Sequence, residues 1–262
     1  ARASSPVRAG LGVGLATLMA RSGAANAAMT PSLRLTPCHL DHLAQEVQCG
    51  VHEVFENRQA KAGRHLGIQF AVLEPLRREK EPDPLFILAG GPGQGARSFA
   101  AIAERYFKKV RRAREIVLVD LRGTGESNAL RCPPADGELA SLASLPSDQD
   151  AASRCLKSLD ADPRHYTHKD ALADLDEIRQ RLGCARINLW GGSWGTRAAL
   201  IYAATYPDAV RTVVLDGAVP LDMGFPRSVA ADSERAMGLL FEQCSKDEGC
   251  ASAFPNARID FG

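Results

Sequence analysis

Short apolar runs recur through the middle of the chain, separated by stretches with helical spacing. Residues 84–89, 115–120, 186–190 and 210–215 are each of strand length and almost continuously hydrophobic. Unbroken apolar strands suit a parallel sheet that is buried on both faces. An earlier segment, residues 67–73, alternates apolar and polar positions, which indicates a strand with one exposed face.

Three segments have the spacing of the crossover helices that join parallel strands. They are residues 97–113, residues 194–206, which Pro207 closes, and a segment that Thr167 can cap and Gly183 can end. This alternation predicts an α/β protein with a doubly wound, mostly parallel sheet. Ligands of such a sheet gather at the carboxyl ends of its strands.

Two regions carry no clear period. Residues 37–64 are mixed and polar, and we interpret them as a lead-in segment attached to the main domain, with a binding module as the alternative. Residues 128–162 are rich in Pro, Ser, Ala and Asp, which indicates a long surface loop.

The composition is that of an ordinary globular domain: 262 residues, 45% hydrophobic and 24% charged. A formal net charge of +1 gives no long-range field that would attract nucleic acid or an anionic membrane. We therefore expect a small substrate and no nucleic-acid partner. The oligomeric state is left open.

Residues 1–28 read as a signal peptide. Arg2 and Arg8 precede an apolar run over residues 9–20, and Ala25 and Ala27 have the spacing of a cleavage site. The run is too short for a membrane anchor, so the pattern predicts export to the periplasm or secretion. An Ala-rich terminus or an additional helix is the alternative.

Seven cysteines agree with an oxidising compartment. Sequence neighbours suggest three disulfides and leave Cys184 as a buried thiol, although other connectivities stay open. No spacing typical of a metal site occurs, and we expect neither metal nor organic cofactor. The three expected pairs are Cys38 with Cys49, Cys132 with Cys155, and Cys244 with Cys250.

The motif with the most chemical meaning is Gly-Gly-Ser-Trp-Gly at residues 191–195, between a predicted strand and a predicted helix. Gly-x-Ser-x-Gly in this context is a nucleophile elbow, which presents Ser193 above the sheet. The glycines remove side chains that would crowd the turn. A glycine turn without chemistry is the alternative.

A second glycine-rich turn, residues 90–95, follows an earlier strand. In a serine hydrolase this loop supplies one backbone N–H to the oxyanion hole, and the residue after the nucleophile supplies the other. We assign these donors to Gly91, since Pro92 has no N–H, and to Trp194. A phosphate-binding loop is the alternative, but its usual spacing is missing.

A third motif, residues 120–127, follows the next strand. Asp120, Arg122 and Glu126 are expected to form one polar network that shapes a loop beside the site. The alternative for Arg122 is a contact with a substrate carboxylate.

Together, Gly-Gly-Pro-Gly, Asp-Leu-Arg-Gly-Thr-Gly-Glu-Ser and Gly-Gly-Ser-Trp-Gly-Thr resemble the proline iminopeptidase and tripeptidyl aminopeptidase family of α/β-hydrolases. Residues 214–217 and 244–255 look more like its secreted branch. The resemblance runs from about residue 37 onward. It implies an exopeptidase that acts on the N-terminus of short peptides through an acyl-enzyme. It also implies a hydrolase core over residues 29–225 and the start of a helical cap over residues 226–262.

The chain departs from this family in two ways. Many members have His before Gly-Gly-Pro-Gly, whereas Ala89 stands here. All six histidines also precede Ser193, although the fold orders its triad as Ser, acid, His. We therefore expect the acid, the base, the rest of the cap and the last strands beyond Gly262, so that this chain alone is an inactive fragment. Asp216 as the acid is an alternative, and His165 and His168 are expected at the surface or in capping.

Two other functions stay open. Fold and elbow do not determine the substrate, so an esterase or lipase fits the same frame. A truncated, catalytically silent protein is the third reading.

Overall fold

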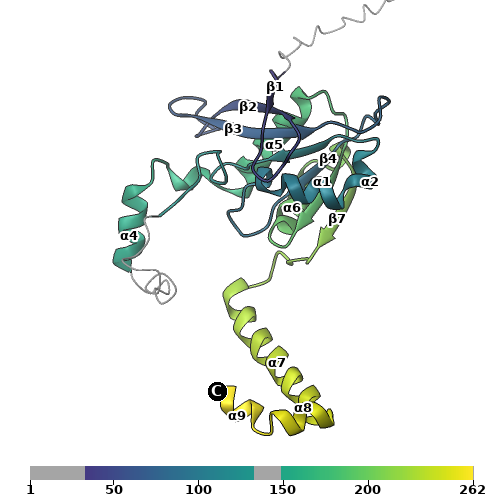
Figure 1. Ribbon diagram of the computed structural model, residues 1–262. Coiled ribbons are helices and arrows are strands. Elements are labelled where there is room, and N and C mark those ends of the chain that lie inside the picture. Colours follow the sequence, from purple (N-terminus) through teal and green to yellow (C-terminus); the bar gives the residue numbers. More distant parts are fainter. Residues whose placement is uncertain (1–32, 133–148, 262) are drawn as a thin grey trace, which may run out of the picture. The chain divides into compact units, whose positions relative to one another are not determined.

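The computed structural model describes residues 33–132 and 149–261 (Figure 1). Seven strands form one sheet in the order β1-β2-β3-β5-β4-β6-β7. The four strands β5, β4, β6 and β7 run parallel, while β1, β2 and β3 join antiparallel. This confirms the predicted α/β class. The strands are β1 (Thr36–Cys38), β2 (Val47–Phe55), β3 (His65–Leu73), β4 (Leu85–Leu88), β5 (Ile116–Val119), β6 (Ile187–Gly192) and β7 (Val210–Asp216).

Helices connect the strands and follow the last of them. None of the described helices is both long enough and apolar enough to cross a bilayer. The short 3-10 helices are η1 (Ala96–Phe99), η2 (Pro163–His165) and η3 (Pro207–Ala209). The α-helices are α1 (Ala100–Tyr106), α2 (Lys108–Arg111), α4 (Gln149–Ser158), α5 (His168–Arg181), α6 (Gly195–Thr205), α7 (Phe225–Lys246), α8 (Glu248–Ala253) and α9 (Ala257–Phe261).

The core lies on both faces of the sheet, because successive side chains of a strand point to opposite faces. In β4, Phe86 and Leu88 pack with residues of α5 and α6 on one face. Leu85 and Ile87 pack with Ala96 and the buried alanines of α1 on the other. Helices on both faces make the sheet doubly wound.

Helix α5 begins and ends as its sequence predicts. The Thr167 hydroxyl accepts a hydrogen bond from the N–H of Asp170, which satisfies one free donor of the first turn. Gly183 follows the last turn with a φ of 74°, a conformation that glycine adopts at little cost. The buried side chains Leu172, Leu175 and Ile178 form its inner face.

The continuous helix predicted over residues 97–113 is wrong. The segment divides into η1, α1 and α2, with a break at Phe107. Phe107 packs edge-on against Trp190, with ring centres 5.4 Å apart. Ile102 and Tyr106, which the spacing places on the inner face, are exposed. Local packing of an aromatic ring therefore overrides the helical period.

The segment predicted as lead-in, residues 37–64, holds β1 and the nine-residue strand β2. Its inner face carries Gly50 and His52, which are not apolar, so the alternation was not recognised. Gly50 is required because a Cβ there would lie 2.3 Å from the ring of Phe70. Val47 and Val54 of the same strand are buried in the core.

The surface loop predicted over residues 128–162 contains the helix α4, so that prediction is wrong in part. Helix α4 is short and mostly polar, and its Leu156 is exposed, so its few apolar residues give only a weak signal in the sequence. Residues 133–148 of this loop and the predicted signal peptide, residues 1–28, lie outside the described residues.

Strand β7 forms where residues 210–215 predict it, but it is not buried. Val213, Val214 and Leu215 are all at least one-third exposed. In the described chain β7 is an edge strand that pairs only with β6, which leaves it without cover on one side.

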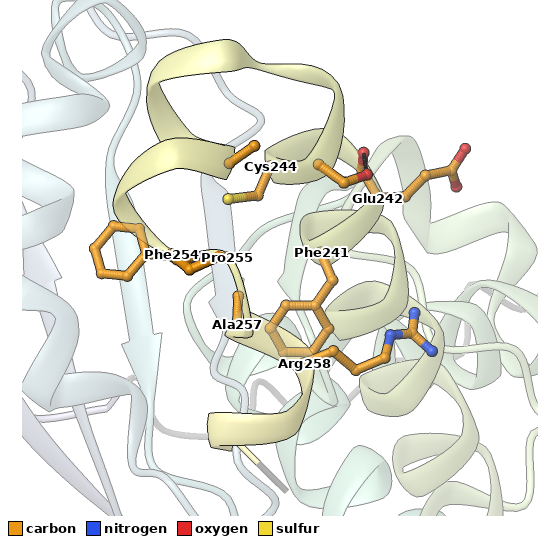
Figure 2. Close-up of a pocket in the computed structure, with 9 residues that line it drawn as sticks. Phe241, Glu242, Cys244, Phe254, Pro255, Ala257 and Arg258 are labelled. Carbon is orange, nitrogen blue, oxygen red and sulfur yellow. Dashed lines mark hydrogen bonds between the residues drawn. The ribbon is translucent and has the colours of Figure 1, made fainter.

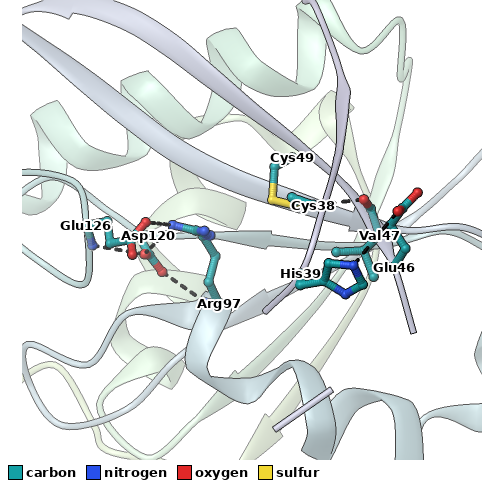
Figure 3. The surroundings of a disulfide bond; sticks show 8 residues. All are labelled: Cys38, His39, Glu46, Val47, Cys49, Arg97, Asp120 and Glu126. Carbon is teal, nitrogen blue, oxygen red and sulfur yellow. Dashed lines mark hydrogen bonds and ion pairs between the residues drawn. A yellow bond between two sulfur atoms is a disulfide. The ribbon is translucent and has the colours of Figure 1, made fainter. Parts of the chain in front are cut away.

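All three expected cysteine pairs lie at disulfide distance, with Cα atoms 5.0 to 5.8 Å apart. Figure 3 shows the pair Cys38–Cys49, which joins β1 to β2. Cys184 is unpaired and buried, as predicted, and burial raises the pKa of its thiol to about 11. It is therefore an unreactive thiol at neutral pH.

A buried carboxylate, Asp83, joins the amino-terminal ends of three parallel strands. It stands just before β4 and accepts hydrogen bonds from Asn188 of β6, from Arg211 of β7 and from Arg114. Burial alone would raise the pKa of Asp83, but these three donors lower it to about 2. The folded state therefore favours the ionised form of the Asp83 carboxyl more strongly than the unfolded chain does.

We predict that Asp83→Asn lowers the free energy of unfolding by about 2 kcal/mol at pH 7. Because the pKa of Asp83 is depressed on folding, this contribution is complete above pH about 4. It is lost as the pH falls toward 2. Urea denaturation at pH 7, 4 and 2 checks the trend.

Asp222→Asn is the matched control, since Asp222 is exposed. The role given to ionisation would be contradicted if Asp83→Asn lowered the free energy of unfolding by the same amount at pH 2 as at pH 7.

Candidate active site

Ser193 lies in the sharp turn between β6 and α6, with its side chain exposed. Its φ is 51°, a left-handed conformation that is uncommon outside glycine. Two neighbours hold it there. The N–H of Ser193 donates to the carbonyl of Asp216 at 2.7 Å, and its carbonyl accepts from the hydroxyl of Thr196 at 2.6 Å. The turn therefore has the form of the predicted elbow.

The elbow glycines allow three backbone segments to approach closely. A Cβ on Gly195 would lie 2.1 Å from the carbonyl oxygen of Leu88, at the end of β4. A Cβ on Gly191 would lie 2.5 Å from the carbonyl oxygen of Gly195 itself. Neither position can hold a side chain unless the backbone moves.

The glycine-rich loop after β4 lies beside the nucleophile, as predicted. A Cβ built on Gly90 would be 3.2 Å from the Cβ of Ser193 and 3.8 Å from its Oγ. Gly91 is exposed, and its φ of 108° is a value that side chains rarely adopt. Trp194 immediately precedes α6. The roles of Gly91 and Trp194 as oxyanion donors stay predictions.

Asp120 connects two loops beside this turn. Its carboxylate accepts from the N–H of Arg97 at 2.9 Å and from the N–H of Glu126 at 3.1 Å. The side chains of Arg97 and Glu126 form an ion pair above it, which Figure 3 shows. Burial raises the pKa of Asp120, and the two N–H donors oppose that shift. The predicted network of Asp120 and Glu126 is present.

Arg122 does not belong to that network, so this part of the prediction is wrong. Its buried guanidinium forms two hydrogen bonds with Asp174 of α5, at 2.6 and 2.8 Å. It also donates to the carbonyls of Glu56 and His165. With no exposed side-chain surface, Arg122 cannot meet a substrate carboxylate, because a buried charge needs all these partners.

In the described part of the chain no histidine forms a hydrogen bond with Ser193. His52 is buried and bonded to Glu177 at 2.9 Å, and His165 lies 3.6 Å from Asp162. His168 is the first residue of α5 and packs near Trp194, with ring centres 6.0 Å apart. The side chain of Asp216 is exposed, while its backbone carbonyl holds the elbow.

The hollows among the described residues include one beside the elbow and one in the helices that follow β7. One, of about 140 Å³, is lined by Ala89, Gly90, Tyr166, His168 and Trp194 among others, and so adjoins the elbow. The other lies within the helical segment that follows β7 and is shown in Figure 2. There the guanidinium of Arg258 lies over the ring of Phe241, 5.6 Å from its centre. Within the described ranges no group of three or more metal-binding side chains gathers.

The family described as the alpha/beta hydrolase fold matches residues 83–240, which is more than half of the chain. This chain belongs to the α/β-hydrolase fold family. The match includes the elbow, the glycine-rich loop and β4 to β7, the elements described above.

Curated relatives of this α/β hydrolase include a "Probable proline iminopeptidase" from Streptomyces coelicolor, 32% identical over 178 residues. That match covers 68% of this chain and 41% of the relative. The proline iminopeptidase of Xylella fastidiosa is 30% identical over 139 residues, covering 51% of this chain and 32% of the relative. The chain thus spans between a third and two-fifths of the length of these relatives.

Among solved structures, the proline iminopeptidase-related protein from Thermus thermophilus is similar to part of this chain. It is 20% identical, with a TM-score of 0.39, and the match covers 63% of this chain and 43% of that one.

Sequence reasoning missed two residues of the elbow in this α/β hydrolase. Thr196 binds the Ser193 carbonyl and accepts from the N–H of Val219 at 2.9 Å. Arg197 lies over the indole of Trp194, 4.8 Å from its ring centre. The spacing i, i+3 between Trp194 and Arg197 is a signal that could have found this pair.

We predict that Gly195→Ala destabilises the protein by roughly 3 kcal/mol, because the new methyl overlaps the Leu88 carbonyl. Gly224→Ala is the matched control, since a Cβ there meets nothing within 4 Å. Thermal unfolding of both variants measures the difference. Equal stability of the two variants would contradict the close approach of α6 to β4.

Proposed function

We propose that Ser193 is the nucleophile of an acyl-transfer reaction. The supporting observation is its left-handed backbone in an exposed turn at the carboxyl end of β6, beside the Gly90 loop. Ligands of open parallel sheets bind at this end of the strands. A hydroxyl held there can attack a carbonyl carbon without moving the backbone.

The oxyanion of the tetrahedral intermediate is assigned to the N–H groups of Gly91 and Trp194. Donors aimed at developing negative charge each contribute roughly 2.7–4 kcal/mol in serine hydrolases. Gly90 brings the first donor's loop next to Ser193, and Trp194 is the residue after it. Backbone amides serve well here because the fold orients them before substrate binds.

The proton acceptor is assigned to residues outside this chain. A serine hydroxyl is a weak nucleophile at neutral pH without an adjacent base. None of the described histidines forms a hydrogen bond with Ser193, and His52 and His165 contact carboxylates instead. In this proposal the triad acid, the histidine and the remainder of a helical cap that starts with α7 belong to the longer protein.

The substrate class we propose is the free N-terminus of a short peptide. Relatives named proline iminopeptidase support it. The resemblance of the three glycine-containing motifs to that family supports it as well. Export is proposed as well, since three cysteine pairs at disulfide distance are typical of an oxidising compartment. Acyl transfer of this kind needs only a nucleophile, a base and amide donors, so the proposal includes no cofactor.

The test is acylation of the protein expressed from its complete reading frame. A fluorophosphonate is expected to label Ser193, and Ser193→Ala is expected to abolish labelling and turnover of a peptide anilide. Ser228→Ala, on α7, is the matched control and should be labelled like the unchanged protein. Labelling that survives Ser193→Ala would overturn the assignment of the nucleophile.

Substrate class is decided by a second comparison. The aminopeptidase proposal predicts cleavage of anilides with a free α-amine and at least a tenfold loss of kcat/KM when that amine is acetylated. Turnover of short-chain esters with no cleavage of any free-amine peptide would instead support an esterase. A reading frame that ends at Gly262 and yields a protein without labelling would support the silent reading.

A further inference from the structure

The described neighbours of the Trp194 indole include two charged or titratable side chains. The guanidinium of Arg197 lies 4.8 Å from its ring centre, within the range of a cation–π contact. The imidazole of His168 lies 6.0 Å away, with the two ring planes inclined by 34°. Burial lowers the pKa of His168, and the charge of Arg197 lowers it further. The three side chains therefore form one cluster.

Arg197 has a second contact outside this cluster. Its Nη2 donates to the backbone carbonyl of Leu221, in the connection between β7 and α7. A planar guanidinium can lie over a ring and donate in its own plane at the same time. Arg197 thus links the Trp194 ring to a backbone segment that is itself bound to the elbow through Thr196 and Val219.

The N–H of Trp194 belongs to the planar peptide unit that joins it to Ser193. The carbonyl of the same unit accepts from the hydroxyl of Thr196 at 2.6 Å, which holds one end of the unit. Trp194, at the other end, precedes the first turn of α6 and lies only partly within the helical hydrogen-bond pattern. Its carbonyl accepts from the N–H of Arg197 at 3.1 Å. The direction of the Trp194 N–H therefore depends on how both ends of this unit are held.

We propose that Arg197 is a positioning residue for the oxyanion hole: it holds Trp194 so that the backbone N–H points to the developing charge. The inference rests on the function proposed above. It predicts that Arg197 acts on the rate of acylation rather than on substrate binding. Trp194 and His168 also line the hollow beside the elbow.

Arg197→Gln keeps a polar side chain of useful length and removes the charge. For the protein from its complete reading frame, we expect the maximal rate of fluorophosphonate labelling to fall about three- to tenfold. The concentration for half-maximal rate should stay within twofold. Arg197→Lys should recover part of the rate, because it restores the cation but not the planar fork.

A second readout follows Trp194 directly. In a background in which Trp190 and every tryptophan outside these 262 residues are replaced by Phe, Trp194 is the remaining tryptophan. Acrylamide should quench its fluorescence at least 1.5-fold more strongly after Arg197→Gln, on the order expected for a ring that loses a covering cation. Arg105→Gln is the matched control, because it removes another cation–π contact, with Tyr106 on α1. It should change neither measurement.

The outcomes separate the two proposals. No labelling of the unchanged protein would overturn the proposed function and this inference together. Normal labelling of the unchanged protein with an equal rate for Arg197→Gln would overturn the inference alone. The inference would also be overturned if Arg197→Gln and Arg105→Gln lowered the labelling rate equally. Loss of any surface cation–π contact would then have the same effect.

Discussion

The close approach of the first turn of α6 to the ends of β4 and β6 is the constraint on which the site depends. Gly195 and Gly191 have no room for a side chain, so the backbone turns directly from strand to helix. A turn this short leaves the residue at its centre with a left-handed conformation and an exposed side chain. The exposure of Ser193 is thus a result of backbone packing rather than of its own chemistry.

Buried carboxylates hold the loops around this turn. Each oxygen of the Asp120 carboxylate accepts a hydrogen bond from a backbone N–H, one from each of two loops. Both oxygens of Asp174 accept hydrogen bonds from Arg122. Such groups are costly to bury unless every lone pair finds a donor. Their satisfied networks therefore fix loop conformation beside the elbow, and a polar substitution at either position would leave several partners without a bond.

The sequence predicted the parts that depend on local pattern. Apolar runs located β4 to β7, and a capping threonine located α5. Glycine spacing located the elbow. Strand β2, which packs on Phe70 through a glycine, was not predicted. Predictions were wrong where a distant contact decides the structure: the first crossover helix breaks where Phe107 meets Trp190, and Arg122 turns to Asp174. The residues that neighbour these positions in the sequence do not indicate which distant side chain each position will contact.

The hydrogen bond from Ser193 to Asp216 also limits the chemistry of the turn. Because the amide proton of Ser193 already belongs to that carbonyl, it cannot be offered to a substrate oxygen. The same bond joins the peptide plane between Gly192 and Ser193 to Asp216, the last residue of β7. The placement of the Ser193 backbone is therefore tied to the pairing of β7 with β6.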